Sequence, residues 1–221
     1  WFVEEFKDDE TVGLVVKTHM QNNSTLDRHA TKNRIKALLD SVNSERKCKI
    51  YFVHGNLTEQ EMTSLYNPEY IDCYITATHG EGFGIPIFNA ACNGIPIIAT
   101  NWSGHLDFLK IPVETRTGKK IIKSHFLKVD YEIKPVGQQH LMPGLITEGC
   151  EWAYPKEKSF KKSLRFIRKN KETTREDTGN LAAYLADKFN LKKITKKYHD
   201  FNKTNILETE DGTNDDDTFY L

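Results

Sequence analysis

The stretch that decides the fold is His79-Gly80-Glu81-Gly82-Phe83-Gly84-Ile85-Pro86-Ile87-Phe88-Asn89-Ala90-Ala91-Cys92-Asn93-Gly94. It lies between two short apolar runs, residues 71–77 and 94–100, whose β-branched and aromatic side chains predict strands. The alternating glycines predict a tight turn, and the residues from about Gly84 onward predict a helix. The stretch is therefore typical of strand, glycine-rich turn, helix and strand, the unit from which parallel α/β sheets are built.

The predicted turn has features of an anion-binding site. Its glycines permit positive φ and close backbone approach, so the N–H groups at the start of the helix can point at a ligand such as a phosphate. Glu81 lies inside the same turn and would repel a phosphate unless it faced a different part of the ligand. A nucleotide sugar, with a diphosphate at one end and hydroxyls at the other, satisfies both conditions. The alternative is that the glycines only form a tight strand-to-helix connection.

A longer pattern favours the nucleotide sugar. Glu-Gly-Phe-Gly-Ile-Pro at 81–86, a small-residue helix, Asn-Gly-Ile-Pro-Ile-Ile-Ala-Thr at 93–100 and Trp-Ser-Gly-His at 102–105 follow one another. This order resembles the donor-binding segment of group 1 glycosyltransferases with the GT-B architecture. That family typically has two Glu residues separated by seven positions, and Glu81 matches the first whereas Asn89 stands at the second. The resemblance implies that the first contacts the donor sugar and the second the ribose, which Asn can still bond as a neutral group.

The remaining elements repeat the same alternation. Strands are expected at 12–17 and 48–54, and helices at 1–6, 24–42 and 58–66. With the strands at 71–77 and 94–100, this order predicts an α/β fold with a parallel, Rossmann-like sheet flanked by helices, in which the strand at 12–17 is buried on both faces. The resemblance implies one half of a GT-B fold followed by C-terminal helices.

The carboxyl ends of the strands are where open α/β sheets gather ligands. Lys17 ends one strand, where it either faces a ligand or is an exposed residue, and His54 ends another as a structural residue. The resemblance implies that the loop 55–57 packs on the nucleotide base. The expected donor-binding residues are Lys17, Gly55, Asn56, His79, Gly80, Gly82, Phe83, Gly84, Ile85 and Asn89, the expected catalytic residue is Glu81, and no metal site is expected.

The second half of the chain has weaker patterns. Ser103 is expected to cap a helix at 103–109, within which His105 and Asp107 face different sides and have structural roles. A polar loop is expected at 113–120, one or two edge strands within 121–136, and irregular chain at 138–150. The pattern Trp152-x-x-Pro155 precedes a predicted helix at 156–167, which further helices at 177–189 and 191–201 follow.

Composition limits the classes of function. The chain has 221 residues, 38% of them hydrophobic, and its 31 basic and 31 acidic side chains give no net field that would recruit nucleic acid or an anionic membrane. No apolar run approaches the roughly 20 residues of a transmembrane helix, and no signal-peptide pattern is present. The four cysteines have no Cys-x-x-Cys spacing, which predicts buried, reduced thiols in a cytoplasmic protein.

The predicted organisation is a donor-binding domain at 1–202 and an acidic, disordered tail at 203–221. Because the sequence begins at Trp1 and the family's N-terminal acceptor domain is not in it, we expect a fragment. The resemblance implies retaining transfer of a glycosyl group from a nucleotide-diphosphate sugar to a saccharide, lipid or protein acceptor, without cofactor or metal. The missing N-terminal domain is then a partner.

Two other functions compete with this one. A degenerate, non-catalytic module that binds nucleotide sugars or carbohydrate is favoured by Asn89 and by the missing half. A dinucleotide-dependent oxidoreductase is disfavoured, because the turn is not a Gly-x-Gly-x-x-Gly after the first strand and no acidic ribose-binding residue lies at the usual offset.

Overall fold

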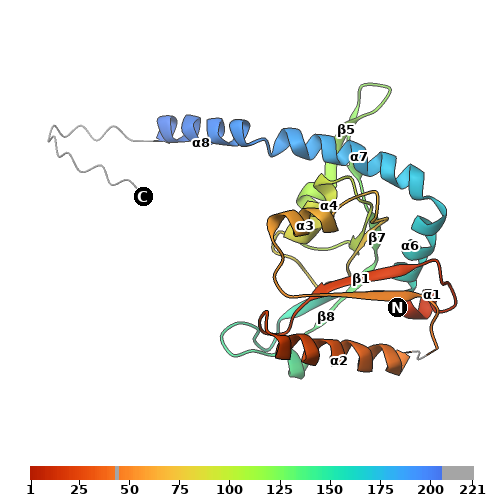
Figure 1. Cartoon of the computed structure of the whole chain (residues 1–221). Helices are drawn as coiled ribbons and strands as arrows, with labels where there is room; N and C mark the ends of the chain where they lie inside the picture. Colours follow the sequence, from red (N-terminus) through yellow and green to blue (C-terminus); the bar gives the residue numbers. More distant parts are fainter. Residues whose placement is uncertain (43–44, 206–221) are drawn as a thin grey trace.

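The structure is a computed structural model that describes residues 1–42 and 45–205 of the chain. Figure 1 shows its helices and strands in chain order, with α2 below β1 and β2 and with α8 extending away from the body. The helices are α1 (Phe2–Phe6), α2 (Thr25–Val42), α3 (Glu59–Leu65), α4 (Ile85–Cys92), α5 (Leu106–Leu109), η1 (Gln138–His140), α6 (Glu157–Lys169), α7 (Lys171–Lys188) and α8 (Leu191–Asn205). The strands are β1 (Gly13–Thr18), β2 (Lys49–His54), β3 (Tyr74–Ile75), β4 (Ile97–Thr100), β5 (Lys110–Glu114), β6 (Lys120–Ser124), β7 (Leu127–Val129), β8 (Tyr131–Pro135) and β9 (Glu151–Pro155).

The first half of the chain confirms the predicted α/β class. β1 pairs in parallel with β2, from Gly13 opposite Lys49 to Thr18 opposite His54. β3 and β7 pair in parallel with the two edges of β4. Thr58 caps α3 in the predicted capping box with Glu61, which satisfies N–H groups that the helix leaves free. The strands and helices alternate as the sequence predicts, and helices flank the parallel strands.

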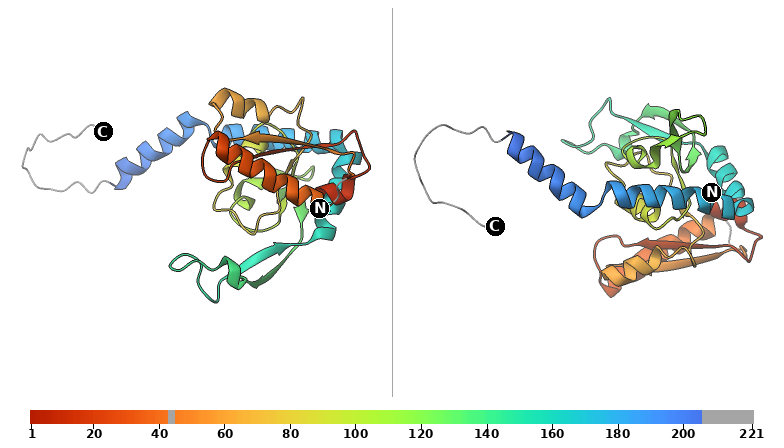
Figure 2. Two further views of the ribbon diagram at one scale, coloured as in Figure 1. Left: turned by 60° about the horizontal axis from the view of Figure 1, so that its bottom comes forward. Right: turned by 90° about the horizontal axis from the view of Figure 1, so that it is seen from above.

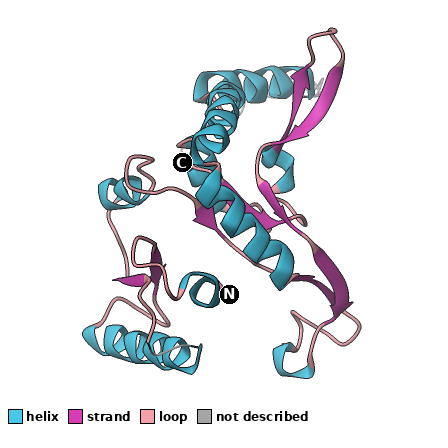
Figure 3. Ribbon diagram, turned by 90° about the vertical axis from the view of Figure 1, so that its right-hand side faces the viewer, coloured by secondary structure: helices cyan, strands magenta, loops and turns pink. Residues whose placement is uncertain are grey.

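The parallel strands do not form one continuous sheet. No ladder joins β1 to β3 in the described part of the chain, and Figure 3 shows the two groups of strands apart. A cleft of about 1110 Å³ lies between them, lined by β1, by residues 71–77 and by aromatic side chains of α1. The prediction that β1 is buried on both faces is therefore wrong: its Val15 is 40% exposed, because a cleft rather than a neighbouring strand lies beside it.

The core forms on the two sides of β4, whose residues are all buried. On one side, α4 packs with α5 and α7 through side chains that include Ile87, Phe108 and Leu185. On the other side, Ile98 packs with β7 and with Phe160 and Leu164 of α6. Because α4 is held by buried contacts along one face, the position of its first turn is fixed.

The segment between β4 and α6 differs most from the expectation. One expectation for this segment is confirmed: β7 is an edge strand of the β3–β4–β7 sheet, where its residues 127–129 pair with residues 98–100 of β4. The expected polar loop at 113–120 is shorter, because β5 and β6 form an antiparallel hairpin around it. β9 was not predicted; it pairs with β8 in a second hairpin, which reaches out from the body in the left view of Figure 2.

The three C-terminal helices are present as predicted, but some of their ends differ from the prediction. α7 begins at Lys171 rather than near residue 177, and it packs on α4. α8 continues to Asn205 and carries exposed apolar residues such as Leu191 and Tyr198. The predicted acidic tail at 203–221 lies almost entirely outside the described residues.

Two further expectations concern cysteines and membranes. All four cysteines are free; Cys48 is buried as predicted, but Cys92 is exposed, because it ends α4 on the side that faces away from the core. Among the helices described by the structure, none combines the length and apolar character needed to cross a membrane.

Candidate functional site

The glycine-rich turn leads directly into α4. Gly84 is the N-cap residue and has a left-handed conformation (φ 84°, ψ 55°), which glycine adopts without a steric cost. A Cβ at Gly84 would lie 3.2 Å from the Ile87 side chain, a residue that is 1% exposed. Pro86 lies in the first helical turn, where its missing N–H removes no helical hydrogen bond. The turn therefore enters α4 with a backbone conformation at residue 84 that requires glycine.

The backbone N–H groups in this turn are not used by the fold. Within residues 1–42 and 45–205, the N–H groups of Phe83, Gly84 and Ile85 have no hydrogen-bond acceptor. Ring contacts fix the Phe83 side chain: its ring centroid lies 5.2 Å from that of Phe88 and 5.1 Å from that of Phe108. These free donors at a helix N-terminus, together with the positive end of the helix dipole, favour an anion.

A second loop, which follows β4, holds the turn in place. The Ser103 hydroxyl accepts a hydrogen bond from the Glu81 N–H (3.0 Å) and donates one to the Glu81 carbonyl (2.6 Å). The Gly104 N–H donates to the same carbonyl (3.0 Å). Ser103 has φ 87°, the one left-handed non-glycine conformation in the described chain. The prediction that Ser103 caps α5 is wrong, because its hydroxyl is engaged by Glu81 and α5 begins later, with His105 as the N-cap residue.

His105 lies directly below the turn and is fully buried. Its Nε2–H donates to the Thr100 carbonyl at 2.7 Å, and burial lowers the pKa of the imidazole, which therefore stays neutral. This geometry confirms the structural role predicted for His105.

Asn89 lies one helical turn after Gly84 and is half-buried. Its side chain lies near the Tyr66 hydroxyl: burial raises the pKa of that phenol, and Asn89 offsets part of the rise. The Tyr66 ring stacks on Tyr74 with centroids 6.4 Å apart. Burial raises the pKa of Tyr74 to about 12, with smaller contributions from Tyr66 and Glu81. The structure therefore brings Asn89 and two tyrosines to the same side of the molecule as Glu81. The contact with Tyr66 was not predicted, because it joins residues 23 positions apart.

The expected residues on β1 and β2 form a separate group. Gly55 has φ 80°, and a Cβ there would lie 1.7 Å from Oδ1 of Asn23, so only glycine fits. The Asn56 N–H donates to the same oxygen at 3.2 Å. Lys17 and Pro86 both line the cleft between the two groups of strands. The structure thus places Lys17 and the start of α4 at one cleft, whereas no hydrogen bond in the described chain joins Gly55 or Asn56 to the glycine-rich turn.

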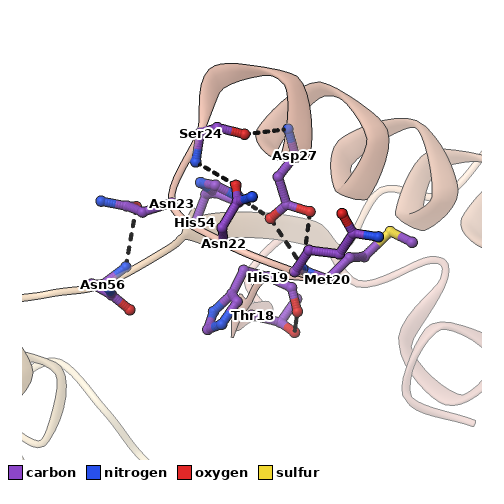
Figure 4. Close-up of polar contacts among 10 residues, drawn as sticks. Thr18, His19, Met20, Asn22, Asn23, Ser24, Asp27, His54 and Asn56 are labelled. Carbon is purple, nitrogen blue, oxygen red and sulfur yellow. Dashed lines mark hydrogen bonds and ion pairs between the residues drawn. The ribbon is translucent and has the colours of Figure 1, made fainter.

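A hydrogen bond between His54 and Asp27 holds the loops at the ends of β1 and β2 (Figure 4). His54 Nε2 lies 2.9 Å from Oδ2 of Asp27, and both side chains are at most 6% exposed. Asp27 also accepts hydrogen bonds from the N–H groups of Met20 and Gln21. The hydrogen bond with His54, followed by these N–H groups, lowers the pKa of the Asp27 carboxyl. His54 therefore has the structural role predicted for it, and Asp27 is its partner, which the sequence did not indicate.

The lowered pKa of Asp27 predicts a pH dependence of stability. Because the pKa of Asp27 is below its ordinary value of 3.8 in the folded protein, its contribution is fully present above that pH and is lost as the pH falls through the lower, folded value. We expect Asp27→Asn to lose stability at pH 6 and to show a smaller further loss between pH 4 and pH 2 than the parent protein. Urea unfolding at each pH measures this, with the exposed Asp107→Asn as control. Equal slopes for Asp27→Asn and the parent would contradict the assignment.

His79 connects the turn to the β8–β9 hairpin. Its ring stacks on Trp152, with centroids 4.9 Å apart and planes at 17°, and meets Tyr154 edge-on at 4.6 Å. Its Nδ1–H donates to the Ala153 carbonyl at 2.9 Å. His79 was predicted to bind the donor, and the structure shows that much of its ring is engaged by β9.

Comparison with known proteins supports the fold. No protein-family model matches the sequence, and no curated protein sequence matches it significantly. Among solved structures, sucrose-phosphate synthase from Thermosynechococcus elongatus matches with a TM-score of 0.55 and 18% identity, over 86% of this chain and 38% of that one. Anabaena HepE, solved in complex with UDP, matches with a TM-score of 0.52 and 12% identity, over 91% of this chain and 43% of that one.

Both matched proteins are glycosyltransferases with the GT-B architecture. The resemblance seen in the sequence is thus confirmed at the level of the fold. The chain spans about two fifths of the length of each of these proteins.

Proposed function

We propose that this chain is the donor-binding part of a glycosyltransferase and that it binds a nucleotide-diphosphate sugar at the glycine-rich turn. The observation that carries the proposal is the set of free N–H groups at the start of α4, next to a carboxylate that the fold holds by its backbone. A ligand with a diphosphate and a hydroxyl-rich sugar satisfies both groups. The UDP bound to HepE, a protein of the same fold, supports this choice of ligand.

The proposed mechanism assigns one task to each group. The N–H groups of Phe83, Gly84 and Ile85, with the Lys17 ammonium across the cleft, neutralise charge that develops on the leaving diphosphate. These donors act without a metal ion. Glu81 accepts hydrogen bonds from sugar hydroxyls and so orients the ring for transfer with retention. Asn89 bonds the ribose, and the loop at 55–56 packs on the base.

The acceptor, the rest of the active site and the cellular compartment are part of the same proposal. The acceptor is a saccharide, lipid or protein, and a further domain supplies the opposite wall of the active site, because the matched structures are more than twice as long as the part they share with this chain. The free cysteines suit a reducing compartment, and we place the protein in the cytoplasm.

Titration calorimetry with uridine and guanosine diphosphate sugars tests the proposal. We expect at least one of them to bind the chain, without a requirement for divalent cations. Glu81→Ala should weaken binding at least tenfold, or about 1.4 kcal/mol, because it removes the acceptor for the sugar hydroxyls.

The matched control is Glu172→Ala, which removes an exposed carboxylate of α7 and should leave binding unchanged. If none of the nucleotide sugars binds, or if Glu81→Ala binds as well as the parent chain, the donor-site assignment is wrong.

A second candidate function is a non-catalytic module that binds the nucleotide sugar without transferring it. Asn89 favours this function, since a neutral amide binds a ribose less strongly than a carboxylate does. A chain that includes the acceptor domain distinguishes the two: transfer by the protein with Asn89 excludes the module, and activity that appears only with Asn89→Glu supports it.

A further inference from the structure

Trp102 is exposed at a position where the fold leaves little freedom. It directly follows β4, and its N–H donates to the Thr100 carbonyl at 2.8 Å. The next residue is Ser103, whose left-handed backbone (φ 87°) is held by two hydrogen bonds with Glu81. A non-glycine residue in this conformation is strained, and such strain clusters at functional sites. The strained Ser103 fixes the Trp102 backbone beside Glu81 while 42% of Trp102 remains exposed.

Tyr131 supports the Trp102 ring. The two ring centroids are 5.4 Å apart and the planes are inclined by 51°. Tyr131 is the first residue of β8, and the hairpin that it opens is tied to the glycine-rich turn by the stacking of His79 on Trp152 of β9. The two aromatic side chains therefore have fixed positions relative to Glu81, from two independent connections.

Charged groups lie at the same end of the hairpin. Glu132 follows Tyr131 and accepts hydrogen bonds from the ammonium groups of Lys134 (2.7 Å) and Lys156 (3.0 Å). A pair of aromatic rings next to the loop that holds Glu81 suits a ligand with apolar C–H faces and hydroxyls at its edges, which is the chemistry of a sugar ring. Successive side chains of a strand point to opposite faces, so Glu132 and the two lysines that it binds lie on the face of β8 opposite Tyr131. These lysines therefore add no positive charge to the aromatic surface that would favour a phosphate or another strong anion.

We infer that Trp102 and Tyr131 form a platform for a neutral saccharide, the acceptor of the reaction. The inference rests on the proposed function, since it places the acceptor next to the Glu81 turn where the donor sugar would lie. A sugar ring packs on the exposed face of Trp102, and Tyr131 fixes the tilt of the Trp102 ring.

Binding of immobilised neutral and acidic oligosaccharides to the 221-residue chain, without nucleotide, tests the platform. We expect binding to neutral members, retained in Trp102→Phe and weakened at least tenfold in Trp102→Ala, because only the alanine removes the aromatic face. Phe166→Ala removes a similarly exposed aromatic residue from α6 and should leave binding unchanged. Circular dichroism of each variant reports whether it folds.

Binding to acidic members only, to none of the panel, or equally to Trp102→Ala overturns the platform. The calorimetry with nucleotide sugars separates the two proposals. If nucleotide sugars bind and saccharides do not, the platform alone fails. If saccharides bind through Trp102 and nucleotide sugars do not, the donor site fails and the platform stands as a saccharide site.

Discussion

Gly104→Ala is expected to destabilise the protein by about 3 kcal/mol, a value in the range seen when backbone strain or overpacking is introduced. A Cβ at Gly104 would lie 1.9 Å from the carbonyl oxygen of Gly82 and 3.0 Å from that of Glu81. Both neighbours are backbone atoms, so the loop after β4 must move away. That movement breaks the hydrogen bonds by which Ser103 and Gly104 hold Glu81.

Gly82→Ala is the matched control, because a Cβ at Gly82 would have no atom within 4 Å and the residue does not have positive φ. It should change the free energy of unfolding by less than about 0.5 kcal/mol. Urea unfolding of the two variants measures the difference. If both variants had the stability of the parent chain, the close contact between the two loops would not exist in solution.

Leu185→Ala is expected to cost about 2–5 kcal/mol, because it removes a side chain that is fully buried between α7 and α4. The loss would report on the site as well as the core, since this packing fixes the helix that presents the free N–H groups. Leu191→Ala in α8 is the control: Leu191 is 77% exposed, and its removal should cost less than about 0.5 kcal/mol.

Thermal and urea unfolding of the two leucine variants check this prediction. A small loss for Leu185→Ala would mean that α7 does not cover α4, and the described core would be wrong.

The sequence predicted the glycine-rich turn and α4 because their determinants are local. Gly84 specifies the left-handed N-cap, Pro86 suits the first turn, and the apolar residues that follow have helical spacing. The same holds for α3, whose capping box lies within four residues.

The elements that the sequence did not predict depend on distant partners. Residues 151–155 become a strand only because β8 is available for pairing. The separation of β1 from β3 likewise involves two segments about 60 residues apart, and no local pattern reports whether they pair.

The site residues divide in the same way. Glu81 and its neighbours were predicted from one continuous motif, whereas the group that holds Glu81 was not. A serine before a short helix suggests an N-cap, and only the folded chain shows that the Ser103 hydroxyl instead bonds a residue 22 positions earlier. The engagement of His79 by Trp152 joins residues that are even farther apart.

The most direct test of the central claim is to follow the backbone amide resonances of the chain by NMR while UDP is added. We expect saturable shifts that are largest for Phe83, Gly84 and Ile85, because these N–H groups are free and lie at a helix N-terminus. Amides of the exposed helix α8 serve as an internal control and should not shift. Shifts absent from the turn, or largest elsewhere in the protein, would contradict a diphosphate site at the start of α4.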